Sequence, residues 1–174
     1  FMQLVVQGFL RIIGVARTGR MNSETVGFED VMIELKGKLI GGSKDLDVIS
    51  IVGMAGLGKT TLANKLYSDE SAVSYFDIHT RCCVSQEYTR KDLILALLSD
   101  NTDERDKLER ETESELADKL RKLLMRKRYL LLIDDVWETS AWDDLKLCFP
   151  EDNNGSRIIL TTRNYGVACH AKQN

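Results

Sequence analysis

The sequence predicts an α/β fold, in which helices cover both faces of a parallel sheet. Apolar runs such as Tyr129-Leu130-Leu131-Leu132-Ile133 are continuous rather than alternating, which is typical of strands buried on both faces. Segments with helical spacing separate these runs, which implies right-handed crossovers and therefore parallel strands. A glycine-rich loop, residues 53–60, joins the first run to a helical segment. With 174 residues, the chain has room for one domain with a sizeable core.

The first half of the chain predicts a helix, a strand and a second helix. Residues 29–40 carry Val31, Leu35 and Leu39 at a spacing of four, so we expect a helix that ends at the Gly-Gly-Ser of residues 41–43. The run Val48-Ile49-Ser50-Ile51-Val52 predicts the first strand. After the glycine-rich loop, residues 59–68 place Leu62, Ala63 and Leu66 on one helical face.

The second half continues the alternation. We expect a strand at 78–84, an amphipathic helix at 90–99, a helix at 114–126 with four leucines on one face, and a strand at 129–133. The charged residues 100–115 predict a solvated loop and the start of a helix. Residues 150–155 predict a turn, and Ile158-Ile159-Leu160 predicts a fourth strand.

Residues 1–23 predict a helix or linker that comes from a preceding region. The apolar stretch 4–16 is interrupted by Gln7 and Arg11, is too short for a membrane span and lacks a basic leader. Because the chain begins with Phe1 and not methionine, we expect it to be a fragment of a longer protein.

Composition narrows the class of protein. The net charge of −3 argues against nucleic acid as the main partner, since binding to its backbone needs a basic surface. The four cysteines have no C-x-x-C spacing, and we expect reduced, mostly buried thiols in a cytoplasmic protein. Cys82 and Cys83 are adjacent in an expected strand, so their side chains should point to opposite faces. The two histidines are isolated, which disfavours a zinc site.

The loop at residues 53–60 reads G-M-A-G-L-G-K-T, a complete G-x-x-x-x-G-K-[ST] phosphate-binding loop between a strand and a helix. Its glycines let backbone N–H groups turn toward a polyphosphate. Lys59 then supplies a positive charge for the β- and γ-phosphates, and Thr60 supplies a hydroxyl for Mg²⁺. The sequence therefore predicts a P-loop NTPase fold that binds a nucleoside phosphate.

Two carboxylates follow the most apolar strand. An acidic residue at the carboxyl end of a buried strand helps P-loop proteins to hold Mg²⁺, and we assign this role to Asp134 together with Thr60. Asp135 is then the candidate for orienting or deprotonating an attacking water. Strand ends commonly carry Asp, so the alternative is a pair of solvated carboxylates, which Lys59 and Thr60 upstream make less favoured.

Four motifs in order give the chain a resemblance to a known family. They are residues 53–61, residues 76–86 (Phe76-Asp77 to Val84-Ser85-Gln86), residues 130–137 (L-L-L-I-D-D-V-W) and residues 155–163 (G-S-R-I-I-L-T-T-R). Together they resemble the NB-ARC domain of plant NLR disease-resistance proteins, and Trp137 after the acidic pair is similar to the coiled-coil class. The resemblance covers about residues 24–170, so we expect a linker at 1–23 and a partial NB-ARC domain at 24–174.

The resemblance implies a three-layer fold of the STAND/AAA-like type and roles for matching residues. Nucleotide contacts are implied for the segment before the domain, near the adenine, and for the phosphate loop: Val26, Gly27, Phe28, Gly53, Gly56, Leu57, Gly58, Lys59, Thr60 and Thr61. Arg163 matches a sensor arginine that can reach a γ-phosphate; a surface arginine is the alternative. For Trp137 we favour a buried or half-buried aromatic that shapes the loop.

Two departures from the family pattern matter. Ala55 stands where glycine is frequent, which reduces the freedom of the loop, although binding should survive. The chain ends at Asn174, before the fifth strand and the winged-helix part of the family domain, and the leucine-rich repeats are absent as well. The first strand should therefore form an unpaired apolar sheet edge, which is an aggregation hazard.

The resemblance implies the ADP/ATP-binding core of an immune-receptor switch. Its partners would be an adenine nucleotide, the receptor's other domains (coiled coil, winged helix and leucine-rich repeats) and further copies in the oligomeric active state. Hydrolysis should be slow or absent, since Asp135 replaces a longer glutamate of related ATPases. The alternatives are a P-loop ATPase or small-molecule kinase of another class, and an inert truncated product that acts only through protein contacts. A GTPase is disfavoured because no N-K-x-D base reader follows.

Overall fold

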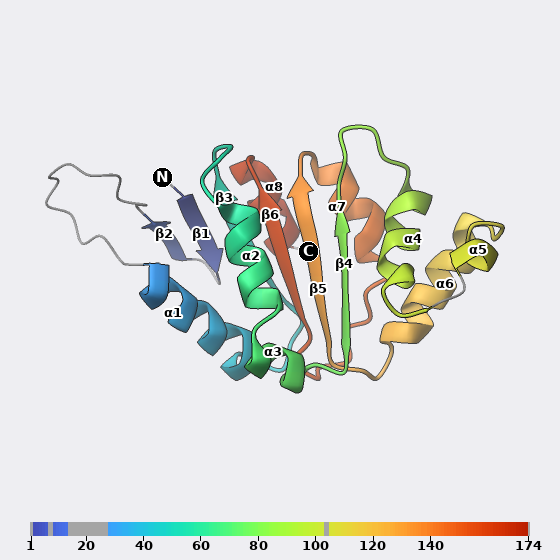
Figure 1. Cartoon of the computed structure of the whole chain (residues 1–174), viewed down its shortest axis with the longest axis horizontal. Helices are drawn as coiled ribbons and strands as arrows, with labels where there is room; N and C mark the ends of the chain where they lie inside the picture. The colour runs from blue at the N-terminus through green and yellow to red at the C-terminus, as the bar shows by residue number, and fades with distance from the viewer. Residues whose placement is uncertain (1, 7–8, 14–27, 103–104, 174) are drawn as a thin grey trace, which may run out of the picture.

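The computed structural model describes residues 2–6, 9–13, 28–102 and 105–173. A six-stranded sheet with the order β2-β1-β3-β6-β5-β4 runs through these residues (Figure 1). Its parallel part is formed by β3 (Asp47–Gly53), β4 (Ile78–Cys83), β5 (Tyr129–Val136) and β6 (Arg157–Thr162). This confirms the α/β fold, and strands 48–52, 78–84, 129–133 and 158–160 were each predicted to within about three residues.

Helices lie on both faces of the sheet and make a three-layer molecule (Figure 1). One face carries α1 (Phe28–Gly41), α2 (Lys59–Tyr67) and α3 (Glu70–Tyr75), and the other carries the remaining helices. These are α4 (Arg90–Ser99), α5 (Arg105–Leu108), α6 (Glu113–Leu124), α7 (Thr139–Lys146) and α8 (Tyr165–Gln173). The predicted helices 29–40, 59–68, 90–99 and 114–126 are confirmed as α1, α2, α4 and α6.

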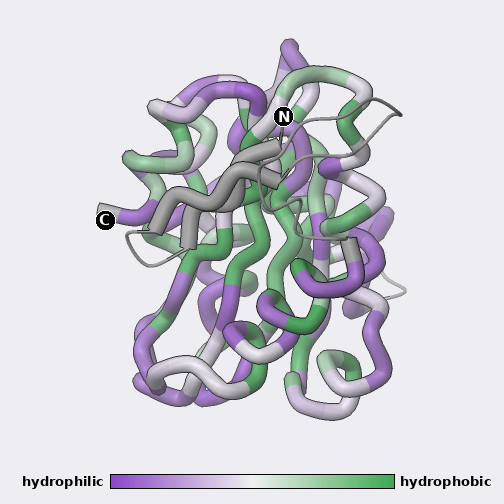
Figure 2. The backbone as a smooth tube through the Cα atoms, turned by 90° about the vertical axis from the view of Figure 1, so that its left-hand side faces the viewer, coloured by the Kyte–Doolittle hydropathy of each residue, from purple (hydrophilic) through white to green (hydrophobic). Residues whose placement is uncertain are grey.

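Two hydrophobic cores follow from the alternation of side chains along the strands. In β5, Leu130 and Leu132 face α1 and α2, whereas Leu131 and Ile133 face α4, α6 and α7. Because both faces are covered, β3, β5 and β6 read as continuous apolar runs, and Figure 2 shows these hydrophobic strands at the centre of the molecule. The sheet is thus a rigid support for the loops at the carboxyl ends of its strands.

The N-terminal region differs from our expectation. Residues Met2–Val6 (β1) and Phe9–Ile13 (β2) form an antiparallel hairpin, not a helix or linker, and β1 pairs with β3 in antiparallel register. The prediction that β3 would be an unpaired edge is therefore wrong, because the hairpin supplies a neighbour for its backbone N–H and C=O groups. The remaining part of residues 1–23 lies outside the described residues.

Four short helices were missed. Helix α3 has only six residues, and α7 and α8 bury small or few apolar side chains, so their periodicity is weak over such lengths. The charged stretch 100–115 also contains the one-turn helix α5, whose Leu108 is buried. Helix α6 begins earlier than expected because Thr112 and Glu115 form a reciprocal capping box at its N-terminus.

Arg157 at the start of β6 fixes the C-terminal end of α1 to the sheet. Its side chain is fully buried, and its guanidinium donates to the backbone carbonyls of Lys38 (3.3 Å), Ser43 (2.6 Å), Asp45 (2.8 Å) and Ser156 (2.8 Å). A Cβ atom on Gly42 would lie 2.5 Å from Nη2 of Arg157, so this close approach requires glycine. The loop before β3 is therefore held in one position.

The cysteines agree with the prediction only in part. Among the described residues all four are free thiols; Cys82 and Cys148 are buried, but Cys83 is exposed and Cys169 is half-buried. Cys82 and Cys83 point to opposite faces of β4, as predicted. In the described part of the chain, no helix combines the length and apolar character that crossing a membrane needs.

Candidate functional site

The phosphate-binding loop lies between the end of β3 and the start of α2. Gly56 and Gly58 adopt φ values of 76° and 80°, a left-handed conformation that favours glycine. Gly58 is also the N-cap of α2, and no side chain caps this helix. The first N–H groups of α2 are therefore directed out of the helix end without a side-chain acceptor, which is the arrangement that binds a phosphate.

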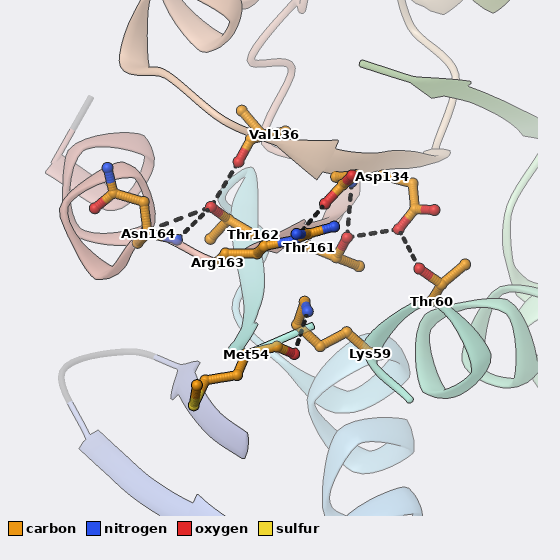
Figure 3. Close-up of polar contacts among 10 residues, drawn as sticks. Met54, Lys59, Thr60, Asp134, Val136, Thr161, Thr162, Arg163 and Asn164 are labelled. Atoms are coloured by element: carbon orange, nitrogen blue, oxygen red, sulfur yellow. Dashed lines mark hydrogen bonds and ion pairs between the residues drawn. The ribbon is translucent and has the colours of Figure 1, made fainter. Parts of the chain in front are cut away.

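Lys59 points back over this loop. Its side chain is 7% exposed, and Nζ donates a hydrogen bond to the carbonyl oxygen of Met54 at 2.9 Å (Figure 3). Burial lowers the pKa of Lys59, and the nearby Arg163 lowers it further, whereas Asp135 and Asp134 oppose the shift. The ammonium group is thus held close to the carboxyl ends of β5 and β6, with a single carbonyl as its hydrogen-bond acceptor.

Asp134 joins three elements at one carboxylate. Its Oδ1 accepts hydrogen bonds from Oγ1 of Thr60 in α2 (3.1 Å) and from Oγ1 of Thr161 in β6 (2.5 Å), as Figure 3 shows. The structure therefore brings together the two residues that the sequence predicts for Mg²⁺. A hydroxyl and a carboxylate at this distance fit a hard cation that prefers oxygen ligands.

Asp135 occupies an irregular position in β5. The register between β5 and β6 shifts between Ile133 and Val136, and Asp135 has a φ of 55°, which is uncommon for a residue with a side chain. Its backbone N–H donates to Oγ1 of Thr161 at 2.8 Å, which fixes the bulge. Because of the bulge, the adjacent Asp134 and Asp135 have different partners, and Asp135 forms an ion pair with Arg163.

Arg163 follows β6 and lies across the end of β5. Its Nε is 3.5 Å from Oδ1 of Asp135, and its guanidinium carbon is 4.4 Å from the centre of the Trp137 ring. The Arg163 side chain is exposed, whereas Trp137 is half-buried, as predicted. Arg163 therefore contacts Asp135 in β5 and Trp137 directly after β5. It also lies near enough to Lys59 to lower the pKa of that residue.

The other predicted residues are placed as follows. Gly53 ends β3, Leu57 is half-buried against the core beneath α2, and Thr61 is exposed in the first turn of α2. Phe28 begins α1, and Val26 and Gly27 lie outside the described residues. The adenine contacts implied for these three residues stay predictions.

Sequence reasoning missed Thr161 as a site residue. It links Asp134 and the backbone of Asp135, and its hydroxyl is fully buried. The signal for it was a threonine pair at the end of an apolar strand, since a hydroxyl in such a strand needs a partner. A cavity of about 680 Å³ also opens beside Asp134, between β4 and α4, and Arg81 and Lys91 are among the residues that line it.

The loop geometry, the buried lysine and the Thr60–Asp134 pair on a parallel sheet define a P-loop NTPase fold. Within this class, residues 28–174 match the NB-ARC domain, and the chain belongs to this family. Late blight resistance protein R1-A of Solanum demissum is 62% identical over 157 residues. The late blight resistance protein homolog R1B-14 of the same species is 60% identical over 157 residues.

These matches cover 90% of this chain but only 12% of either relative, so the chain spans about an eighth of their length. A solved structure, that of the Aeropyrum pernix ORC2 protein in ADPNP–ADP complexes, aligns with a TM-score of 0.53. It covers 86% of this chain and 43% of the ORC2 chain at 14% identity, which supports the fold alone. The chain is thus an NB-ARC domain that is similar to one part of these much longer resistance proteins.

Proposed function

We propose that this chain is the ADP- and ATP-binding core of a plant immune-receptor switch. The observation that carries the proposal is that the uncapped N-terminus of α2, the Lys59 ammonium and the Thr60–Asp134 pair lie together at the carboxyl ends of β3 and β5. Backbone N–H groups and a lysine bind phosphate oxygens there, and the nucleotide would replace the Met54 carbonyl as the partner of Lys59.

Thr60 and Asp134 are the proposed ligands of Mg²⁺. When bound, the ion would neutralise negative charge on the phosphates. Thr161 would hold the Asp134 carboxylate in position through its short hydrogen bond.

We propose that hydrolysis is at most slow. Asp135 is the candidate base for an attacking water, and its side chain is one methylene shorter than the glutamate of related ATPases. Occupancy by ADP or ATP, rather than turnover, would then carry the signal, with each nucleotide favouring a different conformation of the complete receptor.

The relatives support the place of this module in a larger protein. Their names describe resistance proteins, and they are about eight times longer than the matched region. We propose that the coiled-coil, winged-helix and leucine-rich-repeat parts of such a receptor contact this core in the cytoplasm and that the active state is oligomeric. Autonomous switching by the core alone is not expected, because most contacts that distinguish the two states would lie in those parts.

Thermal unfolding with ADP tests the binding proposal. A ligand at about 100 times its Kd stabilises the native state by about 2.7 kcal/mol. For a chain of this size that corresponds to a rise in Tm of about 5–10 °C. A Tm that stays constant with both ADP and ATP in the presence of Mg²⁺ would support the inert-fragment alternative instead.

A multiple-turnover assay separates the switch from an enzyme. The proposal predicts less than about one turnover per minute with ATP and Mg²⁺, far below typical enzymes. Turnover near the enzyme median of about 10 per second, or transfer of phosphate to an added small-molecule acceptor, would instead indicate an ATPase or a kinase.

A further inference from the structure

Trp137 has a position that the proposed nucleotide site does not explain. It lies directly after β5, outside the phosphate loop and the Mg²⁺ pair, yet the Arg163 guanidinium is 4.4 Å from its ring centre. A cation at this distance from an indole face is attracted by the ring's quadrupole, and tryptophan is the best aromatic partner for such a contact. Trp137 therefore contributes to where Arg163 rests.

Asp135 supplies the second half of this resting position. The β-bulge and the left-handed backbone of Asp135 are fixed by Thr161, and they accompany the ion pair between its carboxylate and Nε of Arg163. Strained backbone of this kind persists only where surrounding contacts determine it, and it concentrates at functional positions. Asp135 and Trp137 thus together fix the position of the Arg163 guanidinium.

The same guanidinium lies beside the proposed phosphate position. Arg163 and Lys59 approach one another closely enough for repulsion to contribute to the lowered pKa of Lys59. In Figure 3 the Lys59 ammonium lies below Thr161, and the Arg163 side chain extends past Thr161 toward the carboxyl end of β5. An anion bound between two nearby cations is stabilised by both, and a terminal phosphate would be such an anion.

We propose that Trp137, together with Asp135, holds Arg163 in a resting position that Arg163 leaves only when a γ-phosphate binds. Trp137 is then a positioning residue that sets the preference between ATP and ADP. This inference rests on the proposed nucleotide site. ADP has no γ-phosphate to offer Arg163, so its binding leaves the contact with Trp137 intact. Binding of ATP forms an ion pair between the γ-phosphate and Arg163, and it breaks the contact between Arg163 and Trp137. The preference for ATP over ADP is the difference between these two free energies.

The test measures affinities for ADP and for a non-hydrolysable ATP analogue with Mg²⁺ in a graded series of variants. An exposed cation–π contact corresponds to a roughly two- to fivefold change in an equilibrium constant. Trp137→Leu should therefore raise the ratio of analogue to ADP affinity about two- to fivefold, while the ADP affinity itself stays constant. Trp137→Phe keeps an aromatic face and should give a smaller rise.

The Arg163→Ala background is the matched control. Without the guanidinium, Trp137→Leu should no longer change the ratio, since the two residues act through one contact.

Tryptophan fluorescence provides a second measurement. The sequence has two tryptophans, and Trp142 is buried among core residues, so the analogue should change mainly the emission of Trp137, whereas ADP should not.

The outcomes separate this inference from the proposed function. If ADP binds but the ratio is the same in all Trp137 variants, or shifts equally in the Arg163→Ala background, Trp137 has no positioning role. If ADP and the analogue change the emission equally, the resting position is not specific to the γ-phosphate, and the inference is wrong. If neither nucleotide binds the unaltered protein, the proposed function fails and this inference fails with it.

Discussion

Lys59 shows how one residue carries both the fold and the proposed chemistry. It is the first residue of α2 and is nearly buried, so its ammonium has exchanged water for a single carbonyl acceptor at 2.9 Å. A buried cation with one hydrogen bond has donors to spare, and phosphate oxygens would satisfy them. The pKa of Lys59 is lowered mainly because burial leaves its ammonium incompletely solvated.

The pH dependence of ADP binding follows from this residue. Binding requires the ammonium form, and the pKa of Lys59 in the free protein lies below its usual 10.5 because of burial and the nearby Arg163. A bound polyphosphate would raise this pKa, so binding would take up a proton and the affinity would fall as pH rises through the free-state pKa. Titrations between about pH 7 and about pH 10 should show the decline, with a Lys59→Met variant as control. A decline of equal size in that variant would assign the effect to another group.

Residue by residue, the sequence predicted the ligands better than their mutual contacts. The loop glycines, Lys59, Thr60 and Asp134 could be assigned because the spacing of the motif and the preceding strand fix their chemistry. The contacts of Thr161 with Asp134 and of Arg163 with Asp135 and Trp137 could not be foreseen. They join residues that are 26 to 28 positions apart, and they depend on the bulge in β5 that shifts its register with β6.

At the level of secondary structure, prediction succeeded where burial is two-sided or a long amphipathic face exists. Strands β3, β5 and β6 and helices α1, α2, α4 and α6 have strong periodic or continuous patterns. Helices α7 and α8 are eight and nine residues long, and α8 packs through small side chains such as Ala168 and Ala171, which leave little hydrophobic contrast. Short helices of this kind are stabilised by packing against the core, and their own sequence pattern is too weak to predict them.

Arg157 determines how α1 joins the sheet. Replacing it with methionine would remove donors from four carbonyls, and each buried polar group left without a partner costs about 1–3 kcal/mol. We therefore expect Arg157→Met to lower the free energy of unfolding by at least about 3 kcal/mol, as measured by denaturant unfolding. The control is Arg110→Met, which removes an exposed arginine and should change stability by less than about 0.5 kcal/mol. Equal effects of the two changes would show that the guanidinium contacts add no stability.

The described part of the molecule is a three-layer sandwich whose candidate site residues gather at the carboxyl ends of β3, β5 and β6. This is the edge of a parallel sheet at which ligands bind in open α/β folds. The hairpin of β1 and β2 extends the sheet beyond β3 in the opposite strand direction. Its strands were not predicted, because the short apolar stretch 4–16 reads equally well as a helix segment when its pairing partner is unknown.

Removing the hairpin tests its role as a cover for β3. Without residues 1–13, the largely apolar β3 would present unpaired backbone groups along one side. Such an edge promotes association between chains, so we expect the shortened protein to form larger species in size-exclusion chromatography and to unfold at a lower temperature. A shortened chain that stays monomeric with the same Tm would show that the pairing of β1 with β3 contributes little.

The central claim is that the loop around Lys59 binds an adenine nucleotide, and a calorimetric titration with ADP tests it most directly. Three proteins should be compared: the unaltered chain, Lys59→Ala, and Lys65→Ala, which removes the same charge from an exposed position in the same helix. A charge-assisted hydrogen bond contributes about 1.5–3 kcal/mol, so Lys59→Ala should weaken ADP binding about 10- to 100-fold, with Lys65→Ala close to the unaltered chain. ADP affinity that is the same in the Lys59→Ala protein would contradict the assignment of this loop as the nucleotide site.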